Sequence, residues 1–158
     1  MNRLQSLQSP ARRAFMGFAL AGAVALTGCA TATGPAFTQV QATPDGKAQL
    51  YLYRKSALYA IGAAYPVTNI SSNEKLGALV NASYLLVPLT PGKHFISVDE
   101  RGFTSAKTFE ILAEAGKSYF VEYDSSKGLL LGWGLLSGGA VKTQEQALVD
   151  LKELKRAN

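Results

Sequence analysis

The chain has 158 residues, of which 47% are hydrophobic and 17% charged, which suits one domain with a buried core and excludes a disordered chain. Its single cysteine, Cys29, excludes an intrachain disulfide and a metal cluster built from cysteines. The formal net charge is +5, but Arg3, Arg12 and Arg13 all precede a short apolar run, so the basic excess indicates an export address and not nucleic-acid binding.

A secretory signal is predicted at the start of the chain. Arg12 and Arg13 supply positive charge, the run 14–26 is almost wholly apolar, and small residues follow it. A membrane-spanning helix needs about 20 apolar residues to cross roughly 30 Å of hydrocarbon, and this run is shorter. The segment is therefore predicted to be a cleaved signal rather than a transmembrane helix.

The residues that end the apolar run, Leu26-Thr27-Gly28-Cys29, resemble the lipobox of bacterial lipoproteins. The resemblance implies cleavage between Gly28 and Cys29, a diacylglycerol on the Cys29 thiol, and a fatty acid such as palmitate on the new amino group. Two or three acyl chains anchor a protein stably, because each buried methylene contributes about 0.8 kcal/mol. The alternative is a free, buried cysteine behind an ordinary cleaved signal.

The export route and the final membrane depend on two neighbouring positions. The run Arg12-Arg13-Ala14-Phe15-Met16 resembles the twin-arginine export motif, but paired arginines also occur as plain charge in ordinary signals. Both export routes therefore stay open. Ala30 stands where an Asp would retain enterobacterial-type lipoproteins in the inner membrane. The expected location is the periplasmic face of the outer membrane.

These assignments divide the chain into a signal peptide at 1–28, a flexible tether at 29–46 and a folded domain at 47–158. Three of the 16 cations and none of the 11 acids lie in 1–28, so the net charge of the remainder is +2. Residues 29–46 are small, polar and rich in turn formers, with Phe37 as their single aromatic residue. They are expected to link the lipid to the domain.

From residue 47 the pattern changes to short apolar runs that are separated by turn residues, which predicts an all-β fold. A hairpin is expected around Asn81-Ala82, and Thr90-Pro91-Gly92 predicts a tight turn. About seven strands at this spacing are typical of an antiparallel β-sandwich. The predicted strands are 48–55, 63–70, 75–80, 83–89, 94–99, 104–112 and 117–123.

Residues 128–141 interrupt this pattern, because they are apolar with several glycines and carry the single tryptophan, Trp133. The run is too short to span a bilayer. It is interpreted as a fully buried strand with glycine bends. The alternative is an exposed patch that meets a partner or the membrane.

One helix is predicted near the end of the chain. Thr143 and Gln146 form a capping box, and apolar residues recur at helical spacing through Lys155. The favoured interpretation is an amphipathic helix that packs on the sheet. A helix that binds a partner protein is the alternative.

Three short motifs, Gln49–Arg54, Val80–Tyr84 and Pro88–His94, resemble a bacterial domain of unknown function called DUF2846. The similarity covers roughly residues 47–124. It implies an all-β envelope domain, usually carried by a lipoprotein, and it brings no established catalytic residues.

No catalytic constellation is evident, so the protein is expected not to be an enzyme and to need no cofactor or metal. The only histidine, His94, is expected at the surface of a strand, and its spacing to Asp99 and Glu100 does not support a metal site. Several carboxylates on or beside strands are interpreted as solvated charges. They are Glu110, Glu114, Glu122 and Asp124. The rival hypothesis makes some of them the acids of an envelope glycan or peptidoglycan hydrolase.

Alternation along the first strand places Tyr51 and Tyr53 on one face and Leu50 and Leu52 on the other. Tyrosine suits either a core edge or a binding face. Tyr51, Tyr53 and Trp133 are therefore the candidate binding face for an envelope protein or glycan. The expected function is that of a lipid-anchored periplasmic protein, a non-enzymatic binding or assembly accessory at the outer membrane. No nucleic-acid partner is expected.

Overall fold

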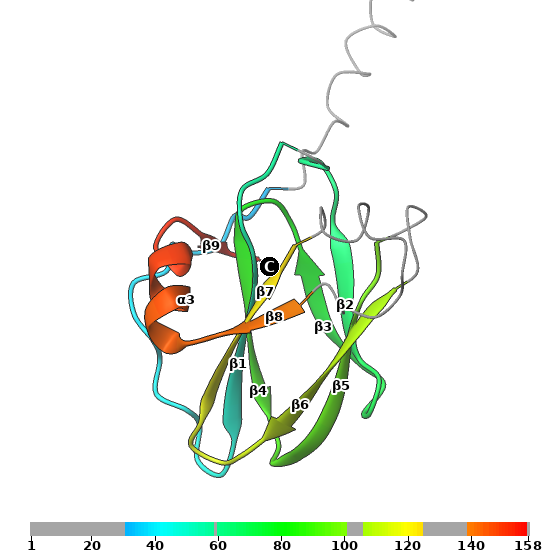
Figure 1. Ribbon diagram of the computed structural model, residues 1–158, viewed down its shortest axis with the longest axis vertical. Helices are drawn as coiled ribbons and strands as arrows, with labels where there is room; N and C mark the ends of the chain where they lie inside the picture. Colours follow the sequence, from blue (N-terminus) through cyan, green and yellow to red (C-terminus); the bar gives the residue numbers. More distant parts are fainter. Residues whose placement is uncertain (1–30, 59, 101–105, 125–138, 158) are drawn as a thin grey trace, which may run out of the picture.

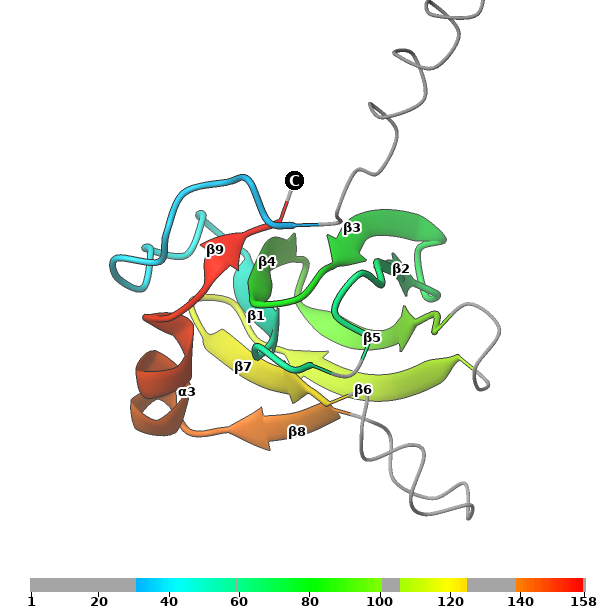
Figure 2. The same ribbon diagram turned by 90° about the horizontal axis from the view of Figure 1, so that it is seen from above.

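The computed structural model describes residues 31–58, 60–100, 106–124 and 139–157. Two sheets pack face to face, as Figures 1 and 2 show, which confirms the predicted all-β sandwich. The five-stranded sheet has the order β8-β7-β1-β4-β9 and the four-stranded sheet the order β3-β2-β5-β6. The elements are β1 (Ala48–Arg54), β2 (Tyr65–Asn69), β3 (Glu74–Leu79), β4 (Ser83–Leu89), β5 (Gly92–Val98), β6 (Lys107–Ala113), β7 (Ser118–Tyr123), β8 (Gly139–Lys142), α3 (Gln144–Leu151) and β9 (Lys155–Arg156).

Two strand pairs are parallel, which the antiparallel expectation did not include. β1 pairs parallel with β7 and antiparallel with β4, and β4 pairs parallel with β9. Parallel neighbours need a long connection, and here the chain between β1 and β7 passes through the whole four-stranded sheet. Periodicity identifies strands but not their partners, so these pairings could not be deduced from it.

The predicted hairpin around Asn81-Ala82 is wrong. β3 and β4 lie in different sheets, and the turn between them carries the chain from one sheet to the other. Ala82 has a positive φ of 52°, and the Ser83 hydroxyl both accepts from the Val80 N–H and donates to the Val80 carbonyl. The Ser83 hydroxyl thus satisfies the two Val80 backbone groups that a hairpin would pair with the opposite strand.

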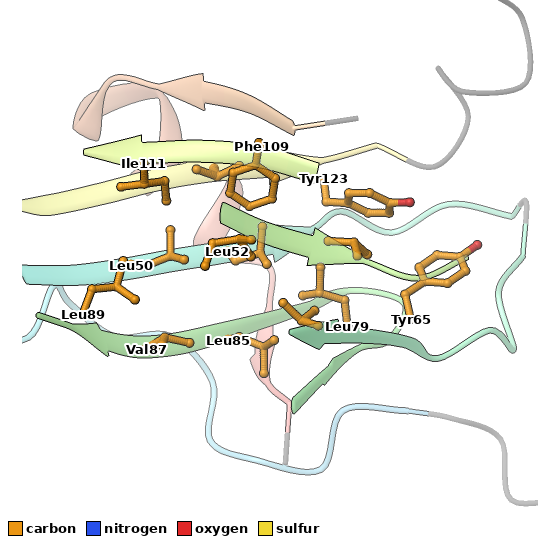
Figure 3. Close-up of a cluster of buried hydrophobic side chains, with 14 of the residues drawn as sticks. Leu50, Leu52, Tyr65, Leu79, Leu85, Val87, Leu89, Phe109, Ile111 and Tyr123 are labelled. Carbon is orange, nitrogen blue, oxygen red and sulfur yellow. The ribbon is translucent and has the colours of Figure 1, made fainter. Parts of the chain in front are cut away.

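The main core lies between the two sheets. Figure 3 shows Leu50, Leu52, Leu85 and Val87 of the five-stranded sheet turned toward the four-stranded one. Ile111 and its neighbours on β5 and β6 complete this layer. Burial of this apolar surface is the largest favourable contribution to the fold.

A second apolar cluster covers the outer face of the five-stranded sheet. Tyr51 and Tyr53 are only 1% and 0% exposed. Figure 2 shows why, because α3 and the segment before β1 both lie over this face. The wet tyrosine face predicted from alternation is therefore wrong, and Tyr51 and Tyr53 do not form an exposed binding face. The cluster consists of Phe37, Tyr51, Tyr53, Tyr84, Leu86, Phe120, Ala147, Leu151 and Leu154.

The segment 31–41 is part of the fold and not a flexible tether. The Phe37 ring is buried and lies nearly perpendicular to the rings of Tyr51 and Tyr84, at centroid distances of 6.1 and 5.8 Å. The Gly34 N–H donates to the Arg156 carbonyl at 3.0 Å, and the Arg156 N–H donates to the Pro35 carbonyl at 2.8 Å. Small, polar composition predicted a tether, but one aromatic residue and paired backbone groups are enough to hold the segment.

The predicted helix is present with its capping box. The Thr143 hydroxyl accepts from the Gln146 N–H, and the Gln146 side chain accepts from the Thr143 N–H, each at 3.4 Å. The helix packs on the sheet through Ala147 and Leu151. It ends at Leu151 and not at Lys155, because Lys155 enters the short strand that pairs with β4.

The interpretation of 128–141 as a buried strand falls mostly outside the described residues. Only its last part is described, as the start of β8, which pairs antiparallel with β7. Val141 is exposed there, so this end of the run is not buried.

Candidate functional site

The candidate site is an open pocket where β1 and β7 end. Because the two strands are parallel, their carboxyl ends lie at the same edge of the sheet. The pocket has a volume of about 200 Å³. It is lined by Arg54, Lys55, Ser56, Ala57, Glu122, Tyr123 and Asp124. Alternation along the two strands divides these residues between the outer and the inner face of the sheet.

On the outer face, one buried carboxylate joins four elements. Glu122 lies 2.9 Å from the Nζ atoms of both Lys55 and Lys142. Lys55 also lies 3.6 Å from Asp150 of α3, and the Tyr53 hydroxyl donates to Asp150 at 2.9 Å. The network ties β1, β7, β8 and α3 together. Glu122 was expected to be a solvated charge, and that expectation is wrong because the side chain faces the layer beneath α3.

The charge state of Glu122 follows from its partners. Burial raises the pKa of this carboxyl, but hydrogen bonds to Lys55 and Lys142 outweigh burial and hold the pKa below its ordinary value. A general acid that works at neutral pH needs a raised pKa. Glu122 is therefore suited to hold the site together as an ion and not to donate a proton.

On the inner face, Arg54 closes the end of the main core. Its side chain is almost fully buried and its guanidinium lies over the Tyr65 ring, 4.8 Å from the centroid. Nη2 donates to the Ala60 carbonyl at 2.8 Å, and Nη1 donates to the Ala63 carbonyl at 3.1 Å. Both carbonyls belong to the loop between β1 and β2. One strand residue thus fixes the shape of that loop.

A second buried acid lies beside Arg54. Glu100 contacts Lys107 at 3.0 Å and accepts a hydrogen bond from the Tyr123 hydroxyl. Burial, followed by the hydrogen bond to Glu100, raises the pKa of Tyr123, so the phenol stays neutral. This end of the main core is therefore closed by charged groups that pack against the Tyr65 and Tyr123 rings.

His94 is buried and lies on β5, where it does not meet the pocket. Its Nε2 lies 2.8 Å from the Thr90 carbonyl, and its Nδ1 lies 2.9 Å from the Asn69 amide nitrogen. A neutral ring that donates from Nε2 and accepts at Nδ1 satisfies both contacts. The expectation of a surface histidine is wrong, because its place in the alternation of β5 turns it inward.

The remaining predicted residues fall into three groups. Glu110 and Glu114 are exposed and pair with Lys93 and Lys117 at 3.0 and 2.7 Å, as expected of solvated charges. Asp124 lines the pocket. Gly28, Cys29 and Trp133 lie outside the described residues. Within the described ranges, no group of three or more side chains could hold a metal ion.

The buried charges at this end of the fold were not predicted from the sequence. Arg54 continues the inward alternation of Leu50 and Leu52, so the period-two pattern already placed it inside. Its burial was nevertheless not predicted, because a charged residue at the end of a strand is usually solvated. Glu100 and Lys107 offered no such cue, since Glu100 lies outside regular structure.

Replacing Glu122 with glutamine is expected to lower the free energy of unfolding at neutral pH by about 1–3 kcal/mol, because two charge-assisted hydrogen bonds are lost. The folded pKa of Glu122 lies below the ordinary 4.5, so its contribution is present above that pH and is lost as the pH falls through the folded pKa. Urea unfolding of the wild type and of Glu122→Gln, at neutral pH and at about pH 3, measures this difference.

Glu110→Gln is the matched control for this experiment. Glu110 pairs with Lys93 at a similar distance, but both side chains are about half exposed, so the expected loss is at most about 1 kcal/mol. A difference between wild type and Glu122→Gln that does not shrink on acidification contradicts the assignment of an ionised Glu122.

The fold and the site define a small all-β sandwich domain with a charged pocket at one end. A family model described as protein of unknown function (DUF2846) matches residues 44–133, more than half of the chain. The chain therefore belongs to the DUF2846 family, which confirms the resemblance in the three short motifs. No match was found among curated proteins or among solved structures.

The family match covers only part of the described fold. It covers β1 to β7 and with them the whole four-stranded sheet. The segment 31–41, α3 and β9 lie outside it, and the first two of these cover the tyrosine face. Among the described residues, no helix is long and apolar enough to cross a membrane.

Proposed function

We propose that this protein is a lipid-anchored protein of the bacterial cell envelope, held at the periplasmic face of the outer membrane. The observation that carries the proposal is the order of three features at the start of the chain. Arg12 and Arg13 precede the apolar run 14–26, and Leu26-Thr27-Gly28-Cys29 follows it directly. The lipid on Cys29 holds the domain on the membrane without a spanning helix.

At that membrane the protein acts as a non-enzymatic binding or assembly accessory, with an envelope protein or glycan as its partner. The pocket supports this role, because its buried acid is fixed as an ion between two lysines. Arg54 is likewise committed to loop carbonyls and an aromatic ring. Groups that hold one another in this way build a rigid surface rather than a reacting centre.

Replacing Cys29 with serine is expected to abolish the anchor, because serine has no thiol to carry the diacylglycerol. The variant moves from the membrane to the soluble fraction, and incorporation of labelled palmitate is lost. Fractionation of cells that express the full chain measures the first effect, and metabolic labelling measures the second. Unchanged membrane fractionation of Cys29→Ser refutes the proposal.

A matched variant separates anchoring from sorting. Ala30→Asp keeps Cys29 and the signal, so palmitate labelling is expected to be unchanged. In a host with the enterobacterial sorting rule, the protein is expected to move from the outer to the inner membrane. Retention in the outer membrane contradicts the proposed sorting and leaves the anchor itself intact.

A hydrolase that acts on envelope glycan is the second candidate function, and one observation favours it. The pocket brings Glu122 and Asp124 to one open surface. Zymography of the full protein on peptidoglycan, with Glu122→Gln beside it, separates the two functions. Lytic activity that the variant loses supports the hydrolase, and no activity supports the accessory.

A further inference from the structure

The described chain begins at the same end of the sandwich as the loop between β1 and β2. Thr31 forms a parallel bridge with Asn81, and the Asn81 side-chain oxygen accepts from the Ala57 N–H at 2.9 Å. One asparagine therefore joins the start of the described chain to this loop. Figure 1 shows both at the upper end of the molecule.

This loop presents apolar side chains to solvent in a fixed shape. Residues 56–64 contain no charged residue. Leu58 is 92% exposed and Ile61 is 57% exposed. The Arg54 guanidinium binds the Ala60 and Ala63 carbonyls, and the Ala63 N–H donates to the Ala60 carbonyl at 3.0 Å. The loop is thus held from inside while its two largest described apolar residues point outward.

The anchor point lies close to this loop. Residues 31–41 pack on the domain, so only Ala30 separates the proposed lipid attachment point, Cys29, from Thr31, two residues further along the chain. Two residues span at most about 7 Å, at 3.3–3.6 Å for each residue. If Cys29 carries the lipid, the acyl chains enter the membrane beside this end of the sandwich.

We propose that the loop 56–64 rests on the phospholipid surface that holds the Cys29 lipid, with Leu58 and Ile61 in the interfacial layer. The inference rests on the proposed lipid anchor. An exposed apolar loop without charge enters the headgroup boundary with little desolvation cost. Lys55, which precedes the loop, has its ammonium group paired with Glu122 and Asp150 and so does not add an unpaired charge to the contact.

The contact fixes the orientation of the domain. The turns at 90–91 and 114–117 lie at the opposite end of the sandwich, because they connect the far ends of β4 to β5 and of β6 to β7. They point away from the membrane into the periplasm. The candidate pocket, which shares Ser56 and Ala57 with the loop, then lies on the membrane side of the domain.

Two cysteine variants of the full lipidated chain test the contact. Cys29 is the only cysteine, so after lipidation an introduced thiol is the only free one. Leu58→Cys places an environment-sensitive fluorophore in the loop. Leu112→Cys is the matched control, because Leu112 is an exposed leucine, 63% accessible, near the far end of β6. Each protein is reconstituted into vesicles of phosphatidylethanolamine and phosphatidylglycerol, with and without a quencher on the acyl chains.

The expected result is a blue-shifted emission at position 58 that the lipid-borne quencher reduces, with neither effect at position 112. Equal emission at the two positions overturns the inference and leaves the anchor intact. A blue shift at position 58 that the quencher does not reduce also overturns it, because a protein then covers the loop. If the thiol-reactive fluorophore labels the wild-type chain, Cys29 has a free thiol. That outcome overturns the anchor together with the inference.

Discussion

Replacing Leu52 with alanine is expected to lower the free energy of unfolding by about 2–5 kcal/mol, the range for deleting a buried leucine side chain. Leu52 is fully buried in β1, with Leu85 of β4 on one side and Val121 of β7 on the other. Strands on both sides fix the backbone, so the cavity cannot collapse and the cost lies toward the upper end of the range. Urea unfolding monitored by circular dichroism measures the loss.

Leu112→Ala is the control for the core substitution. Leu112 is the same residue type on a strand, but its side chain is exposed, so the expected change is within about 0.5 kcal/mol. A Leu52→Ala protein that unfolds at the same urea concentration as Leu112→Ala contradicts the placement of β1 at the centre of the sandwich.

Replacing Arg54 with alanine is expected to have an effect of similar size, about 3 kcal/mol or more, because hydrogen bonds to charged groups contribute about 1.5–3 kcal/mol each. The substitution removes two bonds to loop carbonyls and the contact with the Tyr65 ring. Unlike the Leu52 variant, it is expected to release the loop 56–64 more than the rest of the fold. Urea unfolding gives the first effect, and hydrogen exchange of the Ala63 amide gives the second.

Arg54→Lys separates the role of charge from that of geometry. Lysine keeps the charge but cannot place two donors on the Ala60 and Ala63 carbonyls at once. Its Ala63 amide is expected to exchange faster than that of the wild type and more slowly than that of Arg54→Ala. Equal exchange in all three proteins contradicts the role of Arg54 in holding the loop.

Elements that depend on local chemistry were predictable from the sequence. The strand Ser83–Leu89 lies where an apolar run between turn residues predicts it. The capping box at Thr143 was readable from two side chains three residues apart. Each of these features needs only neighbours in the chain, which a single sequence contains.

Features that depend on partners distant in the chain could not be predicted in this way. Alternation correctly separated Tyr51 from Leu50, but it does not reveal whether another layer covers the second face. That layer comes from residues before β1 and after β8, which meet only in the folded chain. The burial of Glu122 between Lys55 and Lys142 has the same origin, since β7, β8 and the residue that follows β1 supply the three charges.

The contact between the first and the last described segments also has a mechanical consequence. Backbone hydrogen bonds join Gly34 and Pro35 to Arg156, and Phe37 to Leu154. A force applied through residues that precede Thr31 is therefore taken up first by the Thr31–Asn81 bridge and then by these bonds, whose partners lie in or beside the edge strand β9. Tension from the membrane side would peel the segment 31–41 from that edge and uncover Tyr51 before it loads β1 at the centre of the sheet.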